Sequence, residues 1–148
     1  MAPRRARRRP GENRAQLLEA GLIEFGLFGY HGASTASIAA RAGVPQPHLY
    51  ANFSGKQELF LACLSEASAA LLGAGGASDG SRPGLMVLQA VAAARDEPLR
   101  GALNDELVHL RTRIGEAAFD RILAAAAAAQ LGVPSGVPPG DQGGGQPV

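Results

Sequence analysis

The 148-residue sequence is poor in residues that cross-link chains or bind metals. Its single cysteine, Cys63, excludes an internal disulfide, and its three histidines are too scattered for a structural zinc site. No apolar stretch is long enough to cross a membrane, and none follows the basic N-terminus as a secretory signal would require. We therefore expect a cytoplasmic protein with no metal and no cofactor.

Aromatic and charged residues are also scarce, at 5% and 18% of the sequence. Apolar residues reach 46%, which is enough for the core of one compact domain or of two small ones, but the chain is too short for a large enzyme barrel. Six of the seven aromatic residues lie between positions 25 and 60, so we expect the densest packing there. Residues 132–148 are rich in glycine and proline and are predicted to form a disordered tail.

The small net charge of +1 hides an asymmetry along the chain. Residues 1–56 carry eight Lys or Arg residues against three acidic ones, whereas residues 57–148 are net acidic. A basic first half indicates an anionic partner. Within it, residues 4–9 contain five arginines and no apolar periodicity, so we expect residues 1–13 to be a disordered basic arm. The alternative is a solvated tail without function.

Apolar residues at helical spacing predict an all-α fold. The first helix covers residues 14–28 and closes at Gly29, and a short second helix covers residues 36–42, with Thr35 as N-cap and Gly43 as C-cap. The expected helices that follow are residues 45–53, a helix from Ser54 or Gly55 to Gly73, and, beyond a linker at residues 73–84, residues 85–95, 99–114 and 116–131.

The two short helices and the Gly-Val turn between them are typical of a helix-turn-helix, whose second helix enters the DNA major groove. The run from Thr35 to Val44, followed by Leu49-Tyr50, Phe53, Lys56, Glu58 and Leu59, resembles the DNA-binding domain of the TetR family of bacterial transcriptional regulators. Leu17-Leu18-Glu19-Ala20, Phe25-Gly26 and Gly29-Tyr30-His31-Gly32 extend the resemblance over about residues 14–62.

The resemblance implies a DNA-binding domain over residues 14–58, joined by a long helix to a helical ligand-binding and dimerisation domain over residues 59–131. Residues 85–131 resemble the family only weakly, and the dimerisation helices look shortened. The family's activity would make the protein a repressor that binds a palindromic double-stranded DNA operator as a homodimer and is released by a small-molecule effector.

Four side chains of the second short helix are predicted to contact bases. A glutamine amide can pair with adenine N6 and N7, and a proline ring can lie against a thymine methyl, so Gln46 and Pro47 are the expected base readers. His48 and Tyr50 project from the same helix and can reach base edges or phosphates, as their family counterparts do. His48 could instead be an ordinary exposed residue, and Tyr50 could belong half to the core.

Three further residues are predicted to contact phosphates: Thr35 and Lys56 at helix starts, and Asn52. Two positions depart from the family. Ala36 cannot donate a hydrogen bond to a base, and Pro45 stands where the recognition helix usually has a small polar N-cap.

Four apolar residues of the predicted DNA-binding domain, Phe25, Ile38, Leu49 and Phe53, are expected in the core. Cys63 fits best as a small buried apolar residue, with redox sensing as the alternative.

Two other functions stay open. The protein could bind DNA or heterodimerise through a shortened second domain that has no effector response, which stabilisation by a small molecule would contradict. It could also be a small helical enzyme, although the sequence shows no nucleophile with its base, no carboxylate pair and no phosphate-binding loop.

Overall fold

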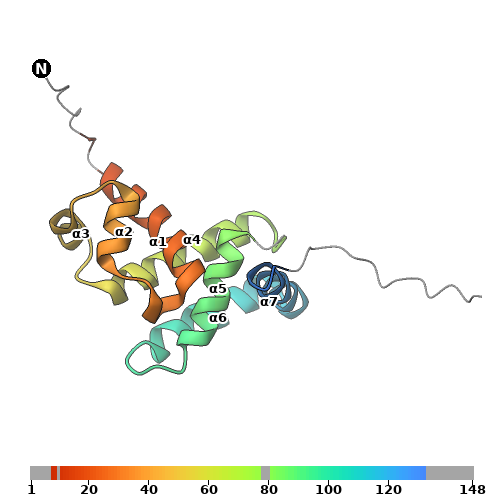
Figure 1. The fold of residues 1–148 in the computed structure, drawn as a ribbon. Coiled ribbons are helices and arrows are strands. Elements are labelled where there is room, and N and C mark those ends of the chain that lie inside the picture. Colours follow the sequence, from red (N-terminus) through yellow and green to blue (C-terminus); the bar gives the residue numbers. More distant parts are fainter. Residues whose placement is uncertain (1–7, 10, 78–80, 133–148) are drawn as a thin grey trace, which may run out of the picture.

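The computed structural model describes residues 8–9, 11–77 and 81–132, and within these ranges it contains seven α-helices and no strand (Figure 1). The predicted all-α fold is therefore confirmed. The arginines at positions 4–7 and the predicted tail, apart from Gly132, lie outside the described residues. The helices are α1 (Glu12–Gly32), α2 (Thr35–Ala42), α3 (Gln46–Asn52), α4 (Lys56–Gly73), α5 (Arg82–Ala93), α6 (Arg100–Ile114) and α7 (Glu116–Gln130).

The caps of α2 set the geometry of the helix-turn-helix. Gly43 ends the helix in the left-handed conformation (φ 63°, ψ 32°), as predicted for its C-cap. The predicted N-cap was wrong by one residue. Ser34, not Thr35, has the extended backbone that an N-cap needs, and its hydroxyl accepts a hydrogen bond from the Ser37 backbone N–H at 3.0 Å. Thr35 is therefore the first residue inside the helix.

A kink at Gly29 divides α1. The backbone there has φ 73° and ψ −179°, a conformation that side chains disfavour, so the regular helix stops at Gly29 as predicted. One further turn, Tyr30–Gly32, follows in a new direction, and the Ala33 N–H closes it by donating to the Gly29 carbonyl at 3.2 Å. The kink directs this turn toward the start of α2.

Helix α5 begins earlier than its predicted start at residue 85. It starts at Arg82 with Pro83 in its first turn, where the missing N–H of proline removes no intrahelical hydrogen bond. The linker between α4 and α5 is correspondingly shorter.

In the ranges that the structure describes, no helix combines the length and the apolar character needed to cross a bilayer.

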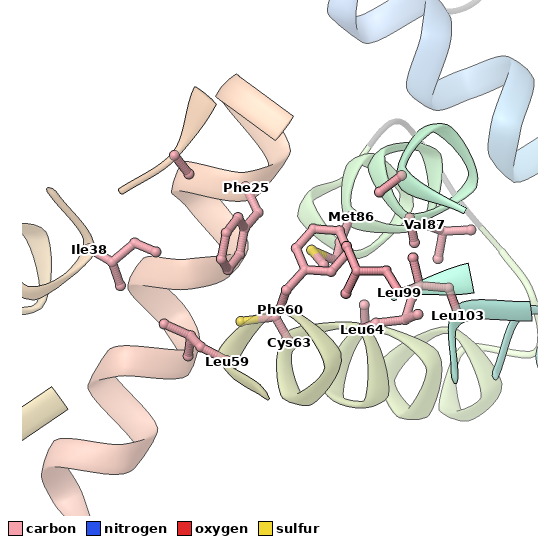
Figure 2. Packing of buried hydrophobic residues seen from close by; sticks show 14 of the residues in the cluster. Phe25, Ile38, Leu59, Phe60, Cys63, Leu64, Met86, Val87, Leu99 and Leu103 are labelled. Carbon is pink, nitrogen blue, oxygen red and sulfur yellow. The ribbon is translucent and has the colours of Figure 1, made fainter. Parts of the chain in front are cut away.

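One hydrophobic cluster joins α1–α3 to α4–α7. The four core residues predicted for the first three helices are all at most 1% exposed: Phe25, Ile38, Leu49 and Phe53. Figure 2 shows Phe60 of α4 between Phe25 of α1 and the apolar residues around Met86 of α5. The Phe60 ring meets Phe25 edge-on, with 4.9 Å between ring centroids, and meets Tyr30 at 5.0 Å. The core therefore runs continuously across the predicted domain boundary.

Cys63 lies in this core with no exposed surface, as expected for a small apolar residue. Its Sγ is 3.6 Å from the Leu18 carbonyl oxygen and faces Gly21, where an added Cβ would come within 2.6 Å of the sulfur. Burial raises the pKa of the thiol to about 12, so almost no thiolate forms at neutral pH.

We predict that Cys63 does not react with a thiol reagent such as dithionitrobenzoate at pH 8 while the chain is folded, and that it reacts fully in denaturant. Because the folded-state pKa lies above that of the unfolded thiol, the free energy of unfolding should also fall as pH rises from about 9 to about 12. Cys63→Ala should flatten this alkaline slope in urea unfolding curves. Rapid labelling of the folded protein would contradict the burial of the thiol.

Candidate DNA-binding site

The predicted contact residues lie at the end of the molecule formed by α2, α3 and the start of α4. Figure 1 places α3 at the outer edge, on the side opposite to α7. Leu49 is the buried anchor of α3, whereas Gln46, Pro47, His48 and Tyr50 are exposed. Tyr50 is 50% exposed, so its ring is partly packed and its outer half faces solvent. The helix thus presents a polar surface that nothing in the described chain covers.

Three of the predicted residues are joined by hydrogen bonds. The Gln46 Nε2 donates to Thr35 Oγ1 at 3.2 Å, and the Tyr50 hydroxyl lies 3.0 Å from the same oxygen. Gln46 and Tyr50 are one turn apart on α3, and both reach the first residue of α2. The start of α2 and the outer face of α3 therefore form one hydrogen-bonded surface.

The other predicted residues of α3 lie around this group without joining it. Asn52 Nδ2 donates to the His48 backbone carbonyl at 2.8 Å, which uses one of the two N–H donors of the Asn52 amide. Among the described residues, no hydrogen bond links the His48 ring to Thr35 or Gln46. Pro45 precedes α3 with no side-chain cap, as its residue type predicts.

Lys56 is held at the first turn of α4 rather than extended into solvent. Its Nζ donates to the Ala33 carbonyl at 3.2 Å and lies 4.6 Å from the centre of the Tyr30 ring. An ammonium group has three donors, so further N–H groups remain for an anion. Glu58 helps to fix this helix start by accepting a hydrogen bond from the Ser54 backbone N–H at 2.6 Å, and hydrogen bonds from Ser54 lower the pKa of the Glu58 carboxyl.

An open hollow separates the starts of α2 and α4. Thr35, Tyr50 and Lys56 are among the residues that line it. Two hydroxyls and an ammonium group around one hollow match the acceptor oxygens and the charge of a phosphate. The two helix starts also direct backbone N–H groups toward this region.

Several contacts that support the site were not predicted. Arg41 Nε donates to Glu24 Oε1 at 2.7 Å, which joins α2 to α1, and the Glu24 side chain is only 8% exposed. Glu24 follows Leu17 by seven residues, so it lies on the buried stripe of α1. A carboxylate at a buried position needs a hydrogen-bond donor, but no local sequence pattern identifies Arg41 as that donor. The guanidinium of Arg14 lies 4.5 Å from the centre of the Phe53 ring.

The end of the basic arm lies beside the turn between α2 and α3. Arg8 Nη1 donates to Asn13 Oδ1 at 3.1 Å, and Arg8 Nη2 lies 3.4 Å from where a Cβ on Gly43 would be. The Arg9 backbone N–H donates to Glu12 Oε2 at 3.0 Å. These contacts fix the point at which the arginine run meets the domain.

Two hydrogen-bonding side chains connect α1 with the part of the chain that forms α5–α7. His31, in the turn after the kink, lies 2.6 Å from Asp96 between α5 and α6. Gln89 of α5 donates to the Gly26 carbonyl at 3.4 Å and to Gln130 Oε1 of α7 at 3.1 Å. The sequence suggested no partner for His31, because Asp96 is 65 residues away.

No group of three or more His, Cys, Asp or Glu side chains in the described part of the chain could hold a metal ion.

The fold and this surface define the class of helix-turn-helix domains used by transcriptional regulators. More specifically, residues 17–63 match the sequence model described as "Bacterial regulatory proteins, tetR family", so this part of the chain is similar to the domain that the model describes. The resemblance stated from the sequence is confirmed.

Two curated relatives match part of the chain. The "HTH-type transcriptional activator FasR" of Mycolicibacterium smegmatis is 52% identical over 62 residues, which cover 41% of this chain and 28% of that protein. The "Uncharacterized HTH-type transcriptional regulator YdgC" of Bacillus subtilis is 34% identical over 55 residues, which cover 37% of this chain and 28% of that protein. The similarity thus spans less than a third of the length of either relative.

Solved structures resemble the chain over a longer stretch at low identity. A "putative TetR-family transcriptional regulator" from Mesorhizobium loti gives a TM-score of 0.48 at 17% identity, covering 85% of this chain and 72% of that one. FadR from Bacillus subtilis, solved "in complex with stearoyl-CoA", gives a TM-score of 0.46 at 17% identity, covering 84% and 76%.

Proposed function

We propose that this chain is a TetR-type transcriptional regulator that binds a palindromic operator as a homodimer, with α3 in the major groove. The observation that supports the proposal most strongly is the exposed surface of α3, which carries Gln46 and Tyr50 within a TetR-family domain. One seven-residue helix reads too few base pairs for useful specificity, and two copies at paired half-sites increase it.

The proposed contacts divide by chemistry. Gln46 and Pro47 read base edges, with His48 and Tyr50 beside them, because amide and apolar groups distinguish bases in the major groove. Thr35, Asn52 and Lys56 hold phosphates, supported by the hollow between the starts of α2 and α4. The arginine arm adds affinity that falls with salt, and Arg8 places the end of the arm beside the helix-turn-helix.

We further propose that residues 14–58 bind DNA, while residues 59–131 form the dimer and bind a small-molecule effector that releases the operator, which would make the protein a repressor. The continuous core and the His31 to Asp96 contact support coupling between the two parts, because a shift of α5 and α6 would reach the turn before α2. The Mycolicibacterium relative is named an activator. The position of the operator relative to the promoter distinguishes repression from activation.

Selection of duplexes from a random library by the full chain tests the proposal. We expect a palindromic motif, and we expect Gln46→Ala to lose preference at one base pair of each half-site, by about 1–3 kcal/mol of discrimination. Lys56→Ala should weaken binding to all sequences alike and reduce the salt dependence, because it removes one phosphate contact.

Gln16→Ala is the matched control, since Gln16 lies on α1 outside the proposed contact set. It should recover the same motif as the unaltered chain. A motif without two-fold symmetry would contradict the homodimer, and an unchanged motif in Gln46→Ala would contradict base reading by Gln46.

A further inference from the structure

The Thr35 hydroxyl lies between two side chains of α3. Gln46 Nε2 donates to Thr35 Oγ1 at 3.2 Å, and Tyr50 Oη lies 3.0 Å from the same atom. Gln46 is the first residue of α3 and Tyr50 is one turn later, so the two meet Thr35 from successive turns. The Gln46 side chain, although exposed, is therefore anchored at its amide end.

This anchor leaves a defined pair of groups on Gln46 for DNA. A glutamine amide carries one oxygen and two N–H donors. Pairing with adenine uses the oxygen, which accepts from N6, and the N–H on the same side of the amide, which donates to N7. The other N–H is the one left for Thr35. An amide without an anchor can turn over and offer donor and acceptor in the reverse order.

Tyr50 favours the observed orientation of the Gln46 amide. The Thr35 hydroxyl has one hydrogen and two lone pairs, and in either direction of its bond to Tyr50 it keeps a lone pair for Gln46 Nε2. The reversed amide would need the Thr35 hydrogen for the Gln46 oxygen. When Thr35 donates in its bond to Tyr50, that hydrogen is already used, and only the observed orientation of the amide can bond to Thr35.

The geometry points to a positioning role for Thr35 and Tyr50: they orient the Gln46 amide and so set the base preference at the position that Gln46 reads. The inference rests on the proposed function, because it requires Gln46 to contact a base. This positioning role adds to the proposed phosphate contact of Thr35, whose backbone N–H at the start of α2 remains available for an anion.

The test measures binding of the full chain to the selected operator and to three derivatives that carry the other base pairs at the position relaxed by Gln46→Ala. Thr35→Val keeps the β-branched shape but removes the hydroxyl, and it should reduce the preference for the best base pair by about three- to tenfold. Thr35→Ser keeps the hydroxyl and should retain the preference. Tyr50→Phe should reduce it by about two- to threefold.

Two comparisons separate positioning from other roles. In a Gln46→Ala background, Thr35→Val should cause no further loss of preference, because both changes act on one contact. If Thr35→Val instead weakens all four duplexes equally, or Thr35→Ser loses as much preference as Thr35→Val, the positioning role is overturned while operator binding stands. If Gln46→Ala keeps the full preference, base reading by Gln46 fails, and this inference fails with it.

Discussion

Phe60→Ala is expected to lower the free energy of unfolding by about 3–5 kcal/mol, measured by urea denaturation followed by circular dichroism. Phe60 has no exposed surface and packs edge-on against Phe25 and Tyr30, so truncation removes a large apolar side chain and opens a cavity at the junction of α1, α4 and α5. The loss is a large part of the stability of a chain of this size. Phe60→Leu fills part of that space and should cost about 1–2 kcal/mol.

Phe28→Ala is the matched control, because it makes the same substitution on α1 at a side chain that is 57% exposed. It should change the free energy of unfolding by no more than about 0.5 kcal/mol. Equal effects of Phe60→Ala and Phe28→Ala would show that the aromatic cluster does not hold the junction together. Because the core is continuous, unfolding of each variant should remain a single transition.

Gly29→Ala is expected to cost about 2–3 kcal/mol of stability, since Gly29 has φ 73° and ψ −179°, which residues with a Cβ rarely adopt. The added Cβ would also lie 3.0 Å from Gln89 Oε1, so the Gln89 side chain would have to shift. Thermal and urea unfolding of the full chain would measure the loss. The substitution acts on the kink that directs the Tyr30–Gly32 turn toward α2.

The control is Gly101→Ala in α6, where the added Cβ would meet no heavy atom within 4 Å beyond the adjacent residues and backbone of its own helix, and φ is not positive. It should leave stability unchanged or raise it by up to about 1 kcal/mol, because alanine favours helix more than glycine does. The kink would not need glycine if Gly29→Ala behaved like Gly101→Ala.

The helices could be predicted because their signals are local. Apolar spacing marks the buried stripe of each helix, and Gly29 and Gly43 mark helix ends through the conformations that glycine permits. The N-cap of α2 was misplaced by one residue because Ser34 and Thr35 are adjacent and both residue types cap well. The start of α5 was placed too late because a Gly-rich stretch obscured the proline signal at Pro83.

The contacts that organise the candidate site could not be predicted from spacing. Gln46 and Thr35 are 11 residues apart, and Arg41 and Glu24 are 17 apart, on helices whose relative placement no local pattern specifies. Residue type identified Thr35 and Gln46 separately as candidate DNA contacts. Only the packing of α2 against α3 shows that they bond to each other.

Helix α3 is joined to the core by a single buried residue, Leu49, whereas α1 packs against both α2 and α5. The surface that faces the proposed operator can therefore change without disturbing the interior. A new binding preference would require replacing exposed residues of a seven-residue helix, together with its partner Thr35, while the remainder of the chain stays as it is. Transplanting α1, α2 and α3 together would be harder, because a foreign α1 would also have to fit against α5.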